Sequence, residues 1–167
     1  MGILFIWYLV LILSFNGKNL LNDSISSYLN NDYKNFQVVV VDNGSTDGTL
    51  EFVEKKWAKV TIIRTEKNLG YSGGFNFGLD FAFNKKKANY VVITNNDVVA
   101  DKRLIKELVV VAQKKESIGF VTGKVYYYDN PTVFQTVGKK EDPIWWNGGH
   151  IGGGEEDVGQ YDQVREL

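Results

Sequence analysis

Apolar runs of β-branched residues recur along the chain, and each of them stops at a polar residue. The clearest run is Val38–Val41, which ends at Asp42 and leads into the small polar segment 43–49. Short apolar runs bounded by turn residues are typical of buried strands. The pattern predicts four strands, at residues 8–13, 37–41, 60–64 and 90–94.

The segments between these runs carry apolar residues at helical spacing. Residues 18–29 place their leucines and an isoleucine on one stripe, which predicts an amphipathic helix. Further helices are predicted at residues 48–57, at residues 72–83 and after Asp101. Ser45 or Thr46, together with Asp47, is predicted to cap the helix at residues 48–57, because these side chains accept hydrogen bonds from free backbone N–H groups.

Strands that alternate with helices predict an α/β fold, in which a mostly parallel sheet carries helices on both faces. In the strand order 3-2-1-4, the first strand lies between the strands that end at Asp42 and before Asp97. Ligands bind where the winding of such a sheet reverses. We therefore expect Asp42 and Asp97 to flank one crevice, with Asn16 joining them from the end of the first strand.

The pattern weakens towards the C-terminal end. Residues 129–167 are rich in glycine and show no clear period. We expect loops and short strands there that cover a site, after an α/β core at residues 1–128.

Composition narrows the function classes. The formal net charge is −1, and the longest basic run is Lys85–Lys87, so nucleic acid is not an expected partner. Cysteine is absent, which removes disulfides and thiolate chemistry and agrees with a reducing, cytoplasmic location. Residues 3–13 are continuously apolar but fall short of the roughly 20 residues of a spanning helix. A buried first strand is the favoured interpretation, and peripheral membrane association of Ile3–Trp7 at the inner face is the alternative.

The two acids at the strand ends suggest two different roles in binding a ligand. A carboxylate at Asp42 can accept the ring N–H of a pyrimidine, and a second carboxylate can hold a divalent cation on a diphosphate. A helix or turn cap is the alternative for Asp42. The glycine-rich segment 68–78 has two interpretations as well, close backbone approach to a phosphate or simple turn and packing roles.

Four segments, in this order and spacing, resemble the family 2 glycosyltransferases, and most of all their rhamnosyltransferase-like branch. They are Ser14–Gly17, Val41–Gly48, Asn68–Gly78 and Asn95–Asp97. The resemblance covers about residues 8–167. It implies a nucleotide-sugar binding core at residues 1–128 and the incomplete start of an acceptor or lid region at residues 129–167. It implies a GT-A fold, which is a Rossmann-like α/β/α sandwich, a nucleoside diphosphate sugar donor, a divalent cation (Mg²⁺ or Mn²⁺) and an inverting transfer.

The resemblance also implies roles for single residues. Asp42 matches the acid that contacts the nucleobase, and Asp97 matches the metal ligand. The remaining donor-binding positions that it implies are Ser14, Asn16, Asn43, Asn68, Gly70, Gly74 and Asn96.

Two departures from the family pattern stand out. Asn95 occupies the place where the commoner form of the metal motif has its first acid, which should weaken metal binding. Family members carry their general base on an acidic segment that would lie beyond Leu167. Within the chain, Glu155, Glu156 and Asp157 are candidates by chemistry only, and a solvated loop is the favoured interpretation, so the catalytic residue stays unknown and the chain is expected to be cut short.

The leading hypothesis is transfer of a sugar from a deoxythymidine or uridine diphosphate sugar to a cell-surface glycan or lipid-linked acceptor. One alternative is a nucleotide-sugar-binding fragment without turnover, because the base is missing. A nucleotidyltransferase is the third hypothesis, for which Gly17-Lys18 offers only a faint glycine and basic-residue signal.

Overall fold

A computed structural model describes residues 8–140 and 149–165 of the 167-residue chain. The chain forms two compact units, Met1–Arg103 and Leu104–Leu167, which we call the first and second unit. The boundary expected at residue 128 divides the chain by function and not by compactness, and it stays a prediction. The expected membrane contact of Ile3–Trp7 lies outside the described residues.

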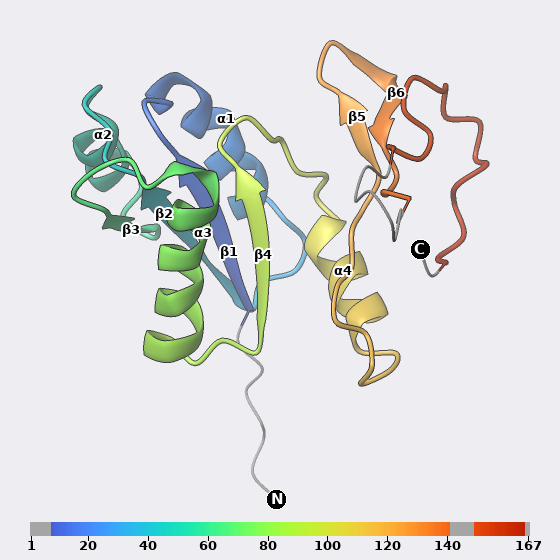
Figure 1. Cartoon of the computed structure of the whole chain (residues 1–167), viewed down its shortest axis with the longest axis horizontal. Helices are drawn as coiled ribbons and strands as arrows, with labels where there is room; N and C mark the ends of the chain where they lie inside the picture. The colour runs from blue at the N-terminus through green and yellow to red at the C-terminus, as the bar shows by residue number, and fades with distance from the viewer. Residues whose placement is uncertain (1–7, 141–148, 166–167) are drawn as a thin grey trace, which may run out of the picture. The chain divides into compact units, whose positions relative to one another are not determined.

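The first unit alternates strands and helices from its beginning (Figure 1). Its elements are β1 (Tyr8–Ser14), α1 (Lys18–Leu29), β2 (Phe36–Asp42), α2 (Thr49–Lys56), β3 (Thr61–Arg64), α3 (Gly70–Asp80), the π-helical turn η1 (Phe81–Lys85) and β4 (Tyr90–Asn95). The four predicted strands and the first helix are confirmed, with element ends that move by one or two residues. The helix predicted at residues 72–83 begins earlier, at Gly70, and its last turn widens into η1.

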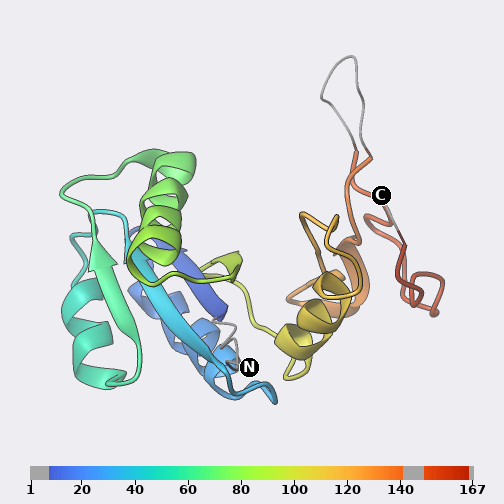
Figure 2. The same cartoon turned by 90° about the horizontal axis from the view of Figure 1, so that it is seen from below.

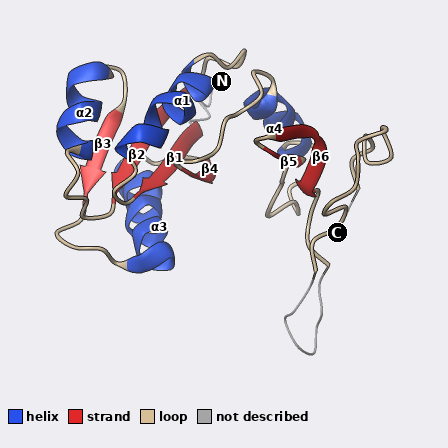
Figure 3. Cartoon of the chain, turned by 90° about the horizontal axis from the view of Figure 1, so that it is seen from above, coloured by secondary structure: helices blue, strands red, loops and turns tan. Residues whose placement is uncertain are grey.

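All strand pairs of the first unit are parallel, and the sheet has the order β3-β2-β1-β4. This is the order on which the expected crevice between Asp42 and Asp97 depends. Helices α1 and α2 cover one face of the sheet and α3 covers the other (Figure 3), and the three layers are also visible from below (Figure 2). The α/β fold with a mostly parallel sheet is therefore confirmed.

Alternate residues of β1 and β2 serve opposite faces of the sheet, as the two-residue period of a strand requires. On the α3 face, Leu11 and Val41 pack in a cluster with Phe75. On the other face, the buried residues of α1 and α2 are Leu21, Ser24, Ile25, Tyr28, Thr49 and Val53. Because both faces are covered, β1 is buried over its whole length and reads as a continuous apolar run.

The second unit begins with α4 (Leu104–Ala112) and continues into an antiparallel hairpin of β5 (Val125–Tyr127) and β6 (Asn130–Thr136). The later glycine-rich residues return to β6 through an isolated bridge between Val133 and Glu156. Phe134 is fully buried and packs against the rings of Tyr126 and Tyr161. The expected mixture of loops and short strands is thus present. Among the described residues, none of the helices is both long and apolar enough to cross a bilayer.

Candidate functional site

The ends of three neighbouring strands bring the predicted site residues to one edge of the sheet. Ser14 pairs with Asp42 in the register of β1 and β2, and Leu13 pairs with Asn95 in the register of β1 and β4. Asp42 therefore ends β2, and Asp97 follows β4, the two strands on either side of β1. Strand order, which local patterning does not show directly, is what turns two separate motifs into one candidate site.

Asp42 is fully buried, and its two carboxylate oxygens have unequal surroundings. Oδ1 accepts a hydrogen bond from the backbone N–H of Ser45 at 2.9 Å. Oδ2 has no hydrogen-bond partner among the described residues, and its neighbour is the Nε atom of Arg64 at 3.6 Å. A buried carboxylate is costly unless it is paired, so Arg64 provides its nearby countercharge.

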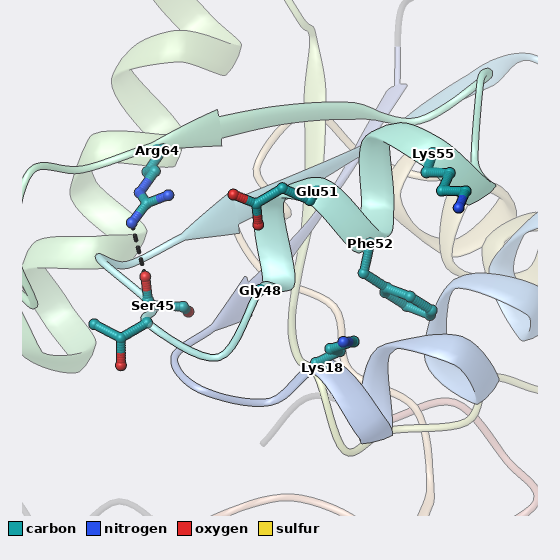
Figure 4. Close-up of a pocket in the computed structure, with 8 residues that line it drawn as sticks. Lys18, Ser45, Gly48, Glu51, Phe52, Lys55 and Arg64 are labelled. Atoms are coloured by element: carbon teal, nitrogen blue, oxygen red, sulfur yellow. Dashed lines mark hydrogen bonds between the residues drawn. The ribbon is translucent and has the colours of Figure 1, made fainter.

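Arg64 is a site residue that the sequence analysis missed. Its Nη2 atom donates a hydrogen bond to the backbone oxygen of Ser45 at 2.7 Å (Figure 4), so the side chain is anchored to the loop after β2. The missed signal was strand register, because Arg64 ends β3 and pairs with Asp42 at the end of β2. Because Arg64 and Asp42 are partners in this register, the guanidinium at the end of β3 lies beside the carboxylate at the end of β2.

The loops after β1 and β2 are tied together by Asn16. Its backbone N–H donates to Ser45 Oγ at 2.9 Å, and its Oδ1 accepts from the backbone N–H of Thr46 at 2.8 Å. Asn16 holds a left-handed backbone with φ of 51°, which asparagine tolerates better than most residues. Ser45 or Thr46 was predicted to cap α2 together with Asp47, and neither hydroxyl does so, because the hydroxyl of Ser45 accepts the N–H of Asn16 and that of Thr46 donates to Asn16 Oδ1.

Asp47 stabilises the start of α2 in place of Ser45. Its Oδ1 accepts from the backbone N–H of Thr49 at 3.1 Å, and its Oδ2 accepts from the backbone N–H of Lys18 at 3.0 Å. Slight burial acts in the opposite direction, but the hydrogen bonds from Thr49 and Lys18 hold the pKa of Asp47 below its usual value. One carboxylate thus fixes the beginnings of both α1 and α2.

Ser14 and Asn96 join the ends of β1 and β4. Ser14 is buried, and its Oγ accepts a hydrogen bond from Asn96 Nδ2 at 3.1 Å. Gly17 makes room for this contact, because a Cβ atom at Gly17 would lie 1.7 Å from Asn96 Nδ2. The contact therefore requires glycine at position 17, a role that the sequence analysis did not assign.

Asn43 braces the loop that leads into α3. Its Oδ1 accepts from the backbone N–H of Leu69 at 3.0 Å, and its Nδ2 donates to Asn68 Oδ1 and to the backbone oxygen of Gly70, each at 3.0 Å. Asn43 is 2% exposed and its amide is occupied by these partners. Asn68 also accepts the N–H of Gly70, which itself holds a left-handed φ of 73°. Binding of the donor by Asn43, Asn68 and Gly70 stays a prediction, whereas the hydrogen bonds by which these residues hold the loop before α3 are present in the structure.

Gly74 and Gly78 support the packing interpretation of the glycine-rich segment. A Cβ atom at Gly74 would lie 2.6 Å from Leu13 Cδ1, and one at Gly78 would lie 2.7 Å from Val41 Cγ2. The two glycines are one helical turn apart, so both leave room for side chains of the sheet on the face of α3 that meets it. Close approach to a ligand at Gly74 stays a prediction.

Asp97 is the exposed acid of the site. It follows β4, and no hydrogen bond or ion pair joins its side chain to another described residue. Within the described part of the chain, no three histidines, cysteines or acids gather as a metal cluster. Mg²⁺ and Mn²⁺ prefer oxygen ligands, and Mg²⁺ is often held by one or two carboxylates with substrate phosphates and water. A single carboxylate at Asp97 fits that type of site.

A pocket of about 580 Å³ opens beside the loop after β2 (Figure 4). Its basic side chains are Lys18, Lys55 and Arg64, and its acidic one is Glu51. This imbalance of charge favours anionic groups at the strand ends.

The acids of residues 155–157 are held by contacts within the second unit. Asp157 accepts hydrogen bonds from the hydroxyl of Tyr126 and the ammonium of Lys124. Glu155 accepts one from the hydroxyl of Tyr161 at 3.0 Å. Glu155 and Glu156 are exposed, as the expected solvated loop requires, and the side chain of Asp157 is 22% exposed because these donors hold it against the β5–β6 hairpin.

Comparison with solved structures identifies the fold type. A mannosyltransferase from Pyrobaculum calidifontis, in complex with GDP-Man and Mn²⁺, superposes with a TM-score of 0.58 and 23% identity over 72% of this chain and 35% of that one. S. aureus TarS 1-349 in complex with UDP-GlcNAc gives a TM-score of 0.55 and 22% identity over 75% of this chain and 42% of that one. Both likenesses concern the fold, which is GT-A-like.

Sequence comparison extends over most of the chain. An uncharacterized glycosyltransferase of Haemophilus influenzae is 31% identical over 112 residues, which are 65% of this chain and 33% of the relative. The chain spans about a third of the length of the curated relatives that it matches first. The family described as "Glycosyl transferase family 2" matches residues 9–156. This chain belongs to glycosyltransferase family 2.

Proposed function

We propose that this chain binds a uridine or deoxythymidine diphosphate sugar at the ends of β1, β2 and β4. The whole protein then transfers the sugar, with inversion, to a cell-surface glycan or a lipid-linked acceptor. The observation that carries the proposal is the pair of acids on either side of β1: a buried carboxylate at Asp42 with one oxygen that accepts no hydrogen bond, and an exposed carboxylate at Asp97. We place the protein in the rhamnosyltransferase-like branch, acting in the cytoplasm or at the inner face of the membrane.

The surroundings of Asp42 suit a nucleobase. An acceptor oxygen that is buried without a partner is costly, and a ligand N–H would satisfy it. The carboxylate cannot turn freely, because Ser45 N–H holds its other oxygen. Asp42 would therefore orient the base, and through it the rest of the donor.

Asp97 would hold a divalent cation against the diphosphate, with Asn96 held beside it by its bond to Ser14. A bound Mg²⁺ or Mn²⁺ supplies positive charge to the leaving diphosphate. The basic side chains Lys18 and Arg64 add positive potential at the same edge of the sheet.

Binding without transfer is an alternative that one observation favours. The acceptor hydroxyl must lose a proton to a base, and Asp157, an acid of the second unit, is already committed to Tyr126 and Lys124. Incubation of the 167-residue chain with a labelled donor and a panel of acceptors separates the two functions. Transfer or donor hydrolysis by this chain would contradict the alternative.

The donor site is tested by calorimetric titration of UDP and dTDP into the wild type and the variants Asp42→Ala and Asp97→Ala, with Mg²⁺ and with EDTA. Losing a hydrogen bond to a charged group weakens binding by roughly tenfold or more. We expect Asp42→Ala to weaken both titrations, and Asp97→Ala to reduce affinity only when Mg²⁺ is present.

The control variant is Asp32→Ala, an exposed acid at the opposite end of the strands. It should bind as the wild type does. Unchanged affinity in both Asp42→Ala and Asp97→Ala would show that the site has been assigned wrongly.

A further inference from the structure

We infer that the pocket beside α2 (Figure 4) is a second binding site, which holds a sugar unit with a phosphate or carboxylate group and so anchors an acidic glycan acceptor. The assignment to the acceptor rests on the proposed function. Binding of the anionic sugar does not, because it follows from the residues that line the pocket and is measured without a donor.

The pocket lies apart from the metal ligand proposed at Asp97. Its lining comes from the start of α1, the loop after β2, helix α2 and the end of β3. Of the described residues that line it, none belongs to β4 or to the turn that follows β4. In the sheet order β3-β2-β1-β4, strands β2 and β4 are two spacings apart, about 10 Å. An anion in the pocket is therefore distinct from a diphosphate held at Asp97.

Two ammonium groups at the pocket have no oxygen partner. Within the described part of the chain, no hydrogen bond or ion pair engages the side-chain amines of Lys18 and Lys55. The third cation, Arg64, already faces Asp42 at 3.6 Å and donates to the backbone oxygen of Ser45. Lys18 and Lys55 therefore supply the positive charge that an anionic ligand would neutralise.

The ammonium of Lys18 borders an open part of the pocket. Its Nζ atom lies 5.9 Å from the ring centroid of Phe52, which is within the range of a cation–π contact. A Cβ atom at Gly48 would lie 3.7 Å from the same Nζ and 3.9 Å from Glu51 Oε2, and glycine has no side chain to fill this space. An anionic oxygen can therefore approach Lys18 at the glycine.

The size of the pocket favours a sugar unit over a small inorganic anion. Its volume of about 580 Å³ lies within the roughly 300–1,000 Å³ of pockets that hold organic ligands. The hydroxyl of Thr46 and the carboxylate of Glu51 also line the pocket, and both can accept hydrogen bonds from sugar hydroxyls. Two cations beside these acceptors fit a sugar that carries a phosphate or a carboxylate.

The first experiment titrates glucose 1-phosphate, glucuronate, glucose and inorganic phosphate into the 167-residue chain by calorimetry. We expect both sugar anions to bind more tightly than inorganic phosphate and than glucose. Because the cations are exposed to solvent, the affinities should fall as the salt concentration rises from about 0.01 M to about 0.1 M. Equal affinities for inorganic phosphate and glucose 1-phosphate would contradict the sugar, and equal affinities for glucose and glucose 1-phosphate would contradict the anion.

Single variants test which charges belong to the site. Lys55→Gln removes one of the two free cations and should weaken the binding of glucose 1-phosphate by about threefold to fivefold. Glu51→Gln removes the acidic charge of the pocket, so it should strengthen binding. The matched controls Lys59→Gln and Glu54→Gln make the same changes at exposed residues of the same segment that do not line the pocket. They should keep the wild-type affinity, and equal effects in Lys55→Gln and Lys59→Gln would overturn the inference.

A competition titration distinguishes this inference from the proposed function. In a chain saturated with UDP and Mg²⁺, glucose 1-phosphate should bind as it does to the free chain, whereas its displacement by UDP would show one shared site and overturn the inference. If glucose 1-phosphate binds and UDP does not, the proposed function fails and takes the assignment to an acceptor with it, while the anionic-sugar site stands. If UDP binds and neither sugar anion does, the donor site stands and the inference is wrong.

Discussion

At the scale of single residues, several side chains of the predicted site form hydrogen bonds with neighbouring residues of the same site. Asn43 follows the acid of the strand end and was assigned to the donor, but its amide bonds to Asn68, Leu69 and Gly70. The sequence motif shows that position 43 belongs to the site. It does not show which partner the amide takes, because those partners lie more than twenty residues away along the chain.

This bracing role predicts the effect of an isosteric change. Asn43→Asp keeps the size of the side chain but removes both amide donors and turns a carboxylate towards the oxygens of Asn68 and Gly70. Buried acceptors without donors cost about 1–3 kcal/mol, so the free energy of unfolding should fall by about 2 kcal/mol in urea titrations. Asn76→Asp, the same change on the exposed face of α3, should cost less than about 0.5 kcal/mol. Equal losses in the two variants would contradict the bracing role.

At the scale of elements, the position of α3 depends on two of its residues that have no side chain. Its glycines at positions 74 and 78 face Leu13 and Val41 of the sheet, so the helix approaches the strands closely. Periodicity predicted this helix, but a glycine in a helix is consistent with packing and with ligand approach alike. Only the position of the neighbouring strands decides between them.

A double-mutant cycle tests this contact. Gly78→Ala would place a Cβ atom 2.7 Å from Val41 Cγ2, and overpacking of this kind costs about 1–3 kcal/mol, more than the ~1 kcal/mol gained in helix propensity. Val41→Ala alone should also destabilise, since Val41 is fully buried. Because Val41→Ala removes the Cγ2 atom that the added Cβ would meet, and that Cβ fills part of the space left, the double variant should lose less stability in urea titrations than the sum of the single variants. Simple additivity would show that α3 does not contact the sheet at this point.

At the scale of the whole molecule, each unit has an acid whose pKa is depressed in the folded state. Hydrogen bonds from Tyr126 and Gly159 lower the pKa of Asp157 in the second unit, and Asp47 plays a comparable part in the first. A depressed folded pKa adds stability that is complete above the unfolded pKa of about 4 and is lost as the pH falls through the folded value. The hydrogen bond from Lys124 to Asp162 raises the pKa of that lysine, so its contribution is lost only in strong alkali.

Asp157 therefore contributes to the acid limb of stability, as Asp47 does. Asp157→Asn should lower the thermal unfolding midpoint at pH 7 and reduce its further decline between pH 5 and pH 3, as followed by scanning calorimetry. Asp129→Asn, an exposed acid in the same unit, serves as the control and should keep the wild-type profile. An unchanged acid limb in Asp157→Asn would mean that its hydrogen bonds with Tyr126 and Lys124 contribute nothing to folding.

The sequence by itself determined the elements of the first unit, the parallel sheet and the positions of Asp42 and Asp97 at strand ends. These features follow from periodicity and from rules of connection, both of which are written in neighbouring residues. Tertiary structure alone decided that Arg64 lies beside Asp42, that Asn43 braces the loop before α3, and that Asp157 is held by Tyr126. Each of these contacts joins residues more than twenty positions apart, so strand register and side-chain packing, which no local pattern specifies, select the partner.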